Sequence, residues 1–218
     1  MKNRGMKCYS AKKKIYYIET MKNSLLTILK NRNTGMVEFK QASDKLATII
    51  ASEIASEIIE ESVIIHTPLK ETIGKKIAQE VILIPILRAG IALLPSFMQL
   101  FESARVGFLG IKREKGAIPH LYYENIPLIK GNDRIIILDP MVATGGSTII
   151  TIEKLIFRGA GSSHITVVGM IGSPEGIEAI RKKFPKVQIK LACIDEGLDE
   201  KKYIIPGLGD FGDRYFGC

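Results

Sequence analysis

The chain has 218 residues, 46% hydrophobic and 25% charged, a composition that can bury a core and argues against intrinsic disorder. Lys and Arg outnumber Asp and Glu by 31 to 23, and the net charge of +8 favours a polyanionic partner: a nucleic acid, a membrane surface or a phosphorylated small molecule. Three widely spaced cysteines build neither a disulfide framework nor a Cys-x-x-Cys metal site, which indicates a reducing, cytoplasmic setting. The apolar run Val81 to Leu87 is far shorter than a membrane span, so no membrane partner is expected.

The first part of the chain differs in composition from the rest. Residues 1–20 carry many charges and few periodic apolar positions, so we predict an N-terminal basic arm, 1–20, followed by one domain, 21–218. From Ser43 apolar residues recur at helical spacing, which predicts an amphipathic helix to about Glu60. The apolar face at 49–59 is expected to be exposed and to favour at least a dimer.

Beyond this helix, apolar runs alternate with amphipathic segments. This order predicts an α/β domain with a mostly parallel sheet and helices on both faces. Ligands of such sheets bind at the carboxyl ends of the strands, so the residues that follow each strand are the candidates for a site. Strands are predicted at 63–66, 81–87, 105–111, 134–138, 165–171 and 187–193, and helices at 89–101, 147–158 and 174–184.

The loop after the 134–138 strand has the features of an anion site. It reads Asp-Pro-Met-Val-Ala-Thr-Gly-Gly-Ser and leads into a helix, whose N-terminus, hydroxyls and successive main-chain N–H groups favour a phosphate. Asp139 at the strand end can accept hydrogen bonds from sugar hydroxyls. For Gly-Gly-Ser alone, a plain strand–turn–helix connection is the alternative. No Lys follows Gly146, so a nucleotide P-loop is excluded.

Three separate motifs resemble those of uracil phosphoribosyltransferases. The loop, with Asp139 followed by Pro140 instead of a second acid, is similar to that family's loop for 5-phospho-α-D-ribose 1-diphosphate (PRPP). Pro-Ile-Leu-Arg-Ala-Gly at 85–90 resembles its pyrophosphate-binding segment, and 203–214 resembles its uracil-binding hood. The resemblance runs from about Leu25 onward. It implies the Rossmann-like type I phosphoribosyltransferase fold with a C-terminal hood over the base site.

Two arginines are candidates for the diphosphate. Arg88 begins a helix, where a cation opposes the helix dipole, and a facing pyrophosphate would explain its place; a surface Arg is the alternative. Arg113 matches the arginine of the family's mobile loop. Lys112 stands where a Tyr is usual, and the loop is about one residue short. For Lys112 and Lys115 a solvated charged loop is the alternative.

The resemblance implies transfer of the phosphoribosyl group from PRPP to N1 of uracil, giving UMP and diphosphate in pyrimidine salvage. Such a reaction depends on positioning and charge stabilisation, which agrees with the lack of a nucleophile or a histidine base in the sequence. It implies catalytic roles for Asp210, Arg113 and Arg88, and uracil recognition by the main chain of Ile204, Gly209 and Phe211 with Asp210 between donor and base. The implied PRPP-binding residues are Arg88, Arg113, Asp139, Pro140, Met141, Val142, Ala143, Thr144, Gly145, Gly146, Ser147 and Asp210.

The resemblance also implies a cofactor and partners. Mg²⁺ is expected to be carried by PRPP without direct protein ligands, because the loop offers one carboxylate. A homo-oligomer, dimer or tetramer, is expected, and GTP is a candidate effector. The alternative function is a non-catalytic RNA-binding regulator on the same fold, which the net charge of +8 would permit. The basic residues form no patch interleaved with aromatic residues, so no nucleic acid partner is expected. A phosphoribosyltransferase for another base is the other rival, and the hood argues against purines.

Four further positions carry smaller expectations. Asp213 and Arg214 are expected to pair with each other structurally. Ala92 and Cys218 depart from the residues usual in the family and are expected not to touch the proposed chemistry.

Overall fold

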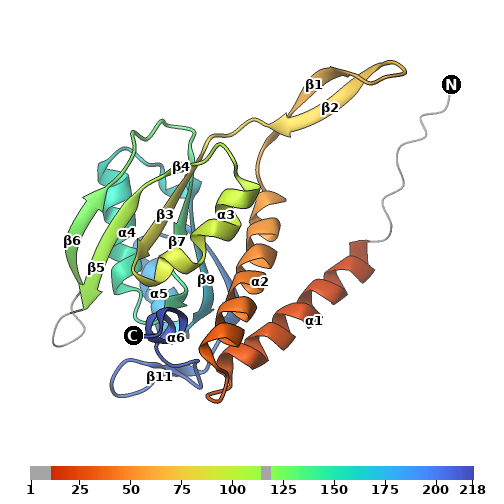
Figure 1. Cartoon of the computed structure of the whole chain (residues 1–218). Coiled ribbons are helices and arrows are strands. Elements are labelled where there is room, and N and C mark those ends of the chain that lie inside the picture. Colours follow the sequence, from red (N-terminus) through yellow and green to blue (C-terminus); the bar gives the residue numbers. More distant parts are fainter. Residues whose placement is uncertain (1–10, 114–118) are drawn as a thin grey trace.

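The computed structural model describes residues 11–113 and 119–218, with the main chain only for 11–17 and Arg113. At its centre is an eight-stranded sheet whose order is β10-β9-β7-β3-β5-β6, with β4 beside β3 and β8 beside β9 (Figure 1). All its pairs are parallel except β5 with β6. The strands are β3 (Val81–Leu87), β4 (Arg105–Val106), β5 (Phe108–Arg113), β6 (Pro119–Asn125), β7 (Arg134–Leu138), β8 (Met141–Val142), β9 (Ile165–Gly172) and β10 (Gln188–Ile194).

Helices cover both faces of this sheet, because the central strands are apolar on both sides (Figure 1). Successive residues of β7 belong to opposite cores: Ile136 packs with the first group of helices and Ile135 with the second. The first group is α1 (Ala11–Lys30), α2 (Met36–Ala55), the 3₁₀ helix η1 (Ala89–Ala92), α3 (Leu94–Leu100) and α6 (Phe211–Phe216); the second is α4 (Gly146–Phe157) and α5 (Pro174–Lys183), and a short 3₁₀ helix, η2 (Ser162–His164), precedes β9.

The predicted α/β architecture with a parallel-rich sheet is therefore confirmed, and five of the six predicted strands lie in this sheet, whereas the strand predicted at 63–66 lies in a separate hairpin. The helix predicted at 43–60 begins earlier and ends earlier, because Phe39 and Ala42 extend its buried face toward the N-terminus. Its face at 49–59 is mostly buried and not exposed as expected: Ile50, Ile54 and Ile58 lie in the chain's own core, and only Ile59, beyond the end of the helix, is largely exposed, at 61%. This face therefore gives no argument for a dimer.

The boundary predicted between an N-terminal arm and the domain falls within one helix. Helix α1 crosses the predicted boundary between residues 20 and 21, and its C-terminal half packs on α2 through Leu25, Leu26 and Leu29. Residues 1–10 lie outside the described residues. The division into an arm and a domain stays a prediction.

A β-hairpin projects from the body between α2 and β3 (Figure 1). It pairs β1 (Glu60–His66) with β2 (Glu71–Ile77) in an antiparallel register. Of this hairpin the sequence predicted only residues 63–66 of β1. Strand β2 was missed because it mixes charged residues with isoleucines and a glycine and has no continuous apolar run. Within the described residues, no helix is both long and apolar enough to span a bilayer.

Candidate active site

A cavity of about 940 Å³ lies at the carboxyl edge of the central sheet. Segments far apart in the sequence form its wall: the β3–η1 connection, the β5–β6 hairpin, the loop after β7, and residues 202–212 near the C-terminus. This is the edge where ligands of parallel sheets bind. The lining residues are Ile86, Leu87, Arg88, Ala89, Ile111, Lys112, His120, Tyr122, Asp139, Met141, Ala143, Ser147, Lys202, Tyr203, Ile204, Gly209, Asp210, Phe211 and Gly212.

Asp139 follows β7 directly, and its carboxylate is oriented by the loop that it begins. One oxygen accepts from the main-chain N–H of Met141 at 3.5 Å, and the other accepts from the hydroxyl of Thr148 on α4 at 3.2 Å. The main-chain N–H of Asp139 donates to the carbonyl of Val168 at 3.0 Å, which fixes the loop to β9. The sequence did not single out Thr148, which holds the acid from the first turn of α4.

Close backbone contacts require a glycine in this loop and another at the start of α5. Gly145 is the N-cap of α4 with φ +75°, and a Cβ there would lie 2.8 Å from the carbonyl oxygen of Gly176. A Cβ on Gly176 would lie 2.2 Å from the carbonyl oxygen of Ala143. The buried Ser173 closes the contact, donating to that carbonyl at 2.6 Å and accepting from the N–H of Gly176 at 3.0 Å. The start of α5 therefore supports the candidate phosphate loop.

Arg88 lies at the start of η1 with an exposed side chain on the cavity wall. The peptide bond between Leu87 and Arg88 is cis. A Cβ on Gly90 would lie 2.3 Å from the carbonyl oxygen of Leu138, so this glycine lets the Arg88 segment pack against the end of β7. Cys218 does not stay away from the site as expected: its Sγ is 3.7 Å from Nη1 of Arg88.

The C-terminal segment 203–214, here called the hood, is ordered by buried aromatic contacts. Phe211 is 1% exposed and packs on Phe39 and Tyr215, with ring centroids 5.5 and 5.6 Å apart. Its ring therefore anchors the hood, and Phe211 is also part of the cavity wall. Ile204 lies in the short strand β12 (Ile204–Ile205), which pairs with β11 (Gly197–Leu198). Asp210 is the N-cap of α6, accepting from the N–H of Asp213 at 3.0 Å.

Arg214 does not pair with Asp213 as expected. Its guanidinium donates to the main-chain carbonyls of Leu208 at 2.7 Å, of Asn31 at 2.8 Å, and of Leu29, and it lies 4.3 Å from the ring centroid of Phe39. Burial lowers the pKa of Arg214. Nearby, burial and a hydrogen bond to Asp44 raise the pKa of Tyr215 to about 12.

The cavity brings most of the predicted residues together. Arg88, the loop acid and the hood residues all line it, whereas Pro140 and Val142 are buried beneath the loop, and Val142 packs in the apolar core. The side chain of Arg113 lies outside the described residues. The predicted residues on the cavity wall are Arg88, Asp139, Met141, Ala143, Ser147, Ile204, Gly209, Asp210 and Phe211; Pro140, Val142, Thr144, Gly145 and Gly146 are not among its lining.

Five polar residues of the wall were not predicted as site residues: Lys112, His120, Tyr122, Lys202 and Tyr203. His120 and Tyr122 are two positions apart on β6, so they share one face of the strand, a spacing that the sequence displays. Gly110 on β5 makes room for that face, since a Cβ there would lie 2.5 Å from the ring of Tyr122. Together with Arg88 and Lys112, Lys202 gives the cavity several cations beside two acids, which favours an anionic ligand.

The described residues do not fit a dedicated magnesium site. Among them, no three His, Cys, Asp or Glu side chains lie close enough together to hold a metal ion. Mg²⁺ requires near-octahedral oxygen ligation, and the loop supplies a single carboxylate with hydrogen bonds to both of its oxygens.

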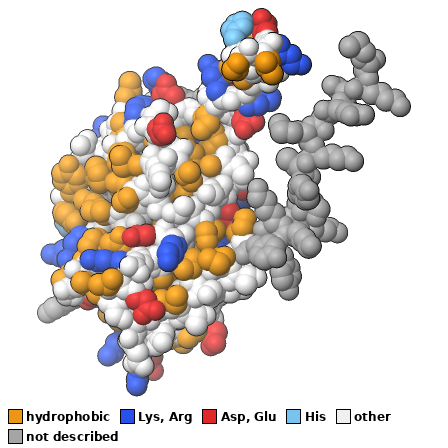
Figure 2. All heavy atoms as spheres, turned by 45° about the vertical axis from the view of Figure 1, so that its right-hand side comes forward, with side chains coloured by type: hydrophobic (Ala, Val, Ile, Leu, Met, Phe, Trp, Pro, Cys, Tyr) orange, Lys and Arg blue, Asp and Glu red, His pale blue; other side chains and the backbone are white. Residues whose placement is uncertain are grey.

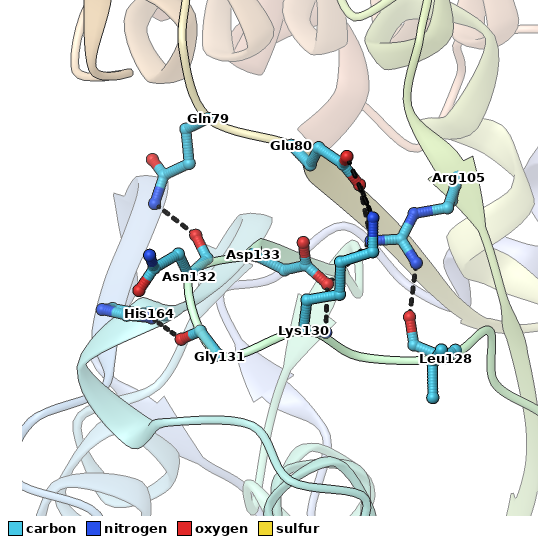
Figure 3. Close-up of polar contacts among 9 residues, drawn as sticks. All are labelled: Gln79, Glu80, Arg105, Leu128, Lys130, Gly131, Asn132, Asp133 and His164. Carbon is cyan, nitrogen blue, oxygen red and sulfur yellow. Dashed lines mark hydrogen bonds and ion pairs between the residues drawn. The ribbon is translucent and has the colours of Figure 1, made fainter.

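A second cavity, of about 610 Å³, lies at the opposite edge of the sheet, where β3 and β7 begin. Its charged groups pair with one another: Arg105 is 2.7 Å from Asp133 and 3.1 Å from Glu80, and Lys130 is 3.2 Å from Glu80 (Figure 3). His164 contacts the carbonyl of Gly131 at 3.0 Å. These contacts join the loops that precede the strands, so the charged groups here have a structural role. The cavity at the carboxyl edge is therefore the candidate active site.

Comparisons with known proteins show the family of the chain. Residues 19–218 match the family described as uracil phosphoribosyltransferase. Proteins named uracil phosphoribosyltransferase from Levilactobacillus brevis and Ligilactobacillus salivarius are 38% and 40% identical over 194 residues, 88% of this chain and 92% of each relative. The solved structure of the AQ2163 protein from Aquifex aeolicus is 33% identical, with a TM-score of 0.82 over 92% of this chain and 94% of that chain.

A more distant likeness concerns the fold alone. The adenine phosphoribosyl transferase from Trypanosoma brucei is 12% identical, with a TM-score of 0.51 over 72% of this chain and 68% of that chain. The family match covers the described cavity, its loop after β7 and its hood together. The chain belongs to the uracil phosphoribosyltransferase family.

Proposed function

We propose that the cavity at the carboxyl edge of the sheet binds PRPP and uracil side by side. As a family member, the chain transfers the phosphoribosyl group of PRPP to N1 of uracil, which gives UMP and diphosphate in pyrimidine salvage. The observation that carries the site assignment is that one cavity is lined by Arg88, by the loop acid Asp139 and by the hood residues Gly209 and Asp210.

The proposed roles follow from chemistry and position. In the transfer, the C1′–oxygen bond to diphosphate breaks, a bond from C1′ to N1 of uracil forms, and N1 loses its proton. Asp139 accepts from the ribose hydroxyls, and the main chain from Ala143 to Ser147, at the N-terminus of α4, binds the 5′-phosphate. Arg88 and Arg113 stabilise the charge of the leaving diphosphate. This division gives the ribose, the 5′-phosphate and the diphosphate each a proposed partner at the carboxyl edge of the sheet.

Uracil is assigned to the hood. Ile204, Gly209 and Phe211 offer main-chain groups, and Asp210 lies between donor and base in this assignment. A fixed main chain matches the donors and acceptors of uracil, and a base with another pattern leaves buried groups unpaired. This supports uracil over the purine bases.

Mg²⁺ and a GTP effector, both on the family resemblance, and a cytoplasmic location, on the three widely spaced cysteines, complete the proposal. Mg²⁺ is proposed to arrive chelated to PRPP, because the loop after β7 offers a single carboxylate. The test is UMP formation from uracil and PRPP by purified protein with Mg²⁺, repeated with EDTA and with GTP. Folded protein that forms no UMP above the control without enzyme contradicts the proposed function.

Arg88→Ala is expected to lower kcat/KM for PRPP by about ten- to a hundredfold, because the loss of one charged hydrogen-bonding partner costs about 1.5–3 kcal/mol. Steady-state kinetics with PRPP varied at saturating uracil measure it. Arg88→Lys, which keeps the charge but loses the planar fork, is expected to recover part of the loss. Arg181→Ala, at an exposed position of α5, is the control, and equal kinetics for both alanine variants remove Arg88 from the site.

We also propose a homo-oligomer that uses the β1–β2 hairpin. Ile64 and Ile73 face each other across the two strands and are 68% and 72% exposed, and Leu69 at the tip is 95% exposed. Figure 2 shows hydrophobic side chains on this projection among Lys, Arg, Asp, Glu and His side chains. A projecting two-stranded ribbon is marginally stable by itself and gains stability from a covering partner.

The double variant Ile64→Lys/Ile73→Lys is expected to have the mass of a monomer by light scattering after gel filtration, where the unchanged chain has at least twice its 24.1 kDa. The added charges would have to be buried at the interface, and the free-energy cost of burying them exceeds the stabilisation that the two isoleucines provide. Leu128→Lys, at a residue of the body that is 79% exposed, is the control. A monomeric unchanged chain contradicts the oligomer, and an oligomeric double variant contradicts the role of the hairpin.

A further inference from the structure

Asp195 is the first residue after β10, and its carboxylate is buried beneath the hood with 2% of the side chain exposed. One oxygen, Oδ2, accepts a hydrogen bond from the main-chain N–H of Gly207 at 2.9 Å. The main-chain N–H of Asp195 donates to the carbonyl of Gly172, at the end of β9, also at 2.9 Å. Asp195 therefore links the middle of the hood to the carboxyl edge of the sheet.

Gly207 lies at the tightest point of the hood. Its φ is +61°, and a Cβ there would lie 2.0 Å from the carbonyl oxygen of Ile204. Ile204 and Gly209, on either side of this turn, line the cavity. A main-chain loop recognises a base only while its N–H and C=O groups are held in one orientation, so the bond to Asp195 acts on the recognition geometry.

Lys30, the last residue of α1, supplies the countercharge. Its Nζ forms an ion pair with Oδ1 of Asp195 and lies 3.7 Å from Sγ of Cys193. The C-terminus of a helix favours a cation at this place. Burial lowers the pKa of Lys30, but the hydrogen bond and charge of Asp195, with the neighbouring Cys193, raise it overall, so the amine is charged at neutral pH.

The same end of α1 holds the other side of the hood. Arg214 donates to the carbonyl of Leu208 in the hood and to those of Leu29 and Asn31 at the end of α1. The last turn of α1 and the residue after it are therefore bonded to the hood at two points, one through Asp195 and one through Arg214.

We propose that Lys30 and Asp195 are positioning residues for uracil, and that the C-terminal end of α1 holds the hood in the conformation that receives the base. Neither residue is part of the cavity lining, so both act through the hood. The proposed PRPP contacts lie on the segments after β3, β5 and β7, apart from Asp210 of the hood, so the pair acts mainly on uracil. This inference rests on the proposed function of the hood.

The matched control is Lys22 of the same helix. Its Nζ is 3.0 Å from Glu53 and 2.9 Å from Glu19, and its side chain is 9% exposed, so Lys22→Met also removes a partly buried ion pair of α1, but away from the hood. The variants to compare are Lys30→Met, Lys30→Arg, Asp195→Asn and Lys22→Met, each as the full chain, measured for both KM values, kcat, melting temperature and amide hydrogen exchange.

Lys30→Met and Asp195→Asn are expected to raise KM for uracil about tenfold with less than a twofold change in KM for PRPP, since an imperfectly held set of hydrogen bonds loses about 1.4 kcal/mol. Lys30→Arg is expected to restore KM for uracil, because it keeps the charge. Lys22→Met is expected to lower the melting temperature and to leave both KM values unchanged. Equal effects on both substrates, or an effect of Lys22→Met of the same size, overturn the inference.

Hydrogen exchange separates this inference from the proposed reaction, because it needs no turnover. Amides of 203–209 are expected to exchange about tenfold faster in Lys30→Met and Asp195→Asn than in Lys22→Met, since the protection of the Gly207 N–H depends on the buried carboxylate. Unchanged exchange in the hood overturns the inference even where UMP is formed. Absence of UMP from the unchanged chain contradicts the function alone.

Discussion

Asp139→Asn is expected to lower kcat/KM for PRPP by about a hundredfold or more, with little change in stability. The carboxylate of Asp139 accepts from the N–H of Met141 and the hydroxyl of Thr148, and these bonds orient it on the wall of the cavity proposed to hold the ribose. An amide removes the negative charge and replaces one acceptor with a donor, so the hydroxyls on that side must accept instead of donate and the charge-assisted bonds are lost. Loss of charged hydrogen bonds at about 1.5–3 kcal/mol each leads to this magnitude.

The measurement is single-turnover and steady-state UMP formation, beside a thermal melt of each variant. Glu102→Gln, at an exposed position, makes the same acid-to-amide change away from the site and is expected to be silent. Thr148→Val keeps the acid but removes the hydroxyl that orients it, so a smaller loss of about tenfold is expected. Near-normal activity of Asp139→Asn would show that the loop acid does not hold the ribose.

Gly90→Ala is expected to destabilise the protein by about 3 kcal/mol and to impair PRPP binding as well. A Cβ at this position lies 2.3 Å from the carbonyl oxygen of Leu138, and the backbone of Pro85 is 3.1 Å away on another side, so the methyl group has no free direction. Relief requires the segment that carries Arg88 to move away from the end of β7, and so away from Asp139. The change therefore affects both stability and the geometry of the site.

Urea unfolding and melting temperature measure the stability part, and KM for PRPP measures the geometric part. Gly131→Ala is the matched control, because a Cβ there meets nothing within 4 Å and the residue has no positive φ. A shift of about 6–12 °C in melting temperature is expected for Gly90→Ala and about none for the control. If both variants melt like the unchanged chain, the close approach of the two loops is not required.

The sequence predicted those strands that are buried on both faces and therefore consist of continuous apolar runs. The strands β3, β7 and β9 are buried on both faces, and each run of Val, Ile and Leu indicated its strand. The rule that ligands bind at the carboxyl ends then placed Arg88 and Asp139 on one edge, and the structure has both on one cavity wall. The hairpin strand β2 was missed, because its side chains face solvent and carry no apolar periodicity.

The sequence by itself determined the order of the elements, the loop chemistry at the strand ends and the family motifs, because these depend on neighbours in the chain. Tertiary structure decided which distant residues support them. Lys30 and Asp195 are 165 positions apart, and Ser173 holds Ala143 across 30 positions. Such pairs leave no local pattern, because a hydrogen bond depends on where the packed core brings two segments and not on their spacing in the chain. The motifs therefore indicated the site, and packing alone revealed what holds it in place.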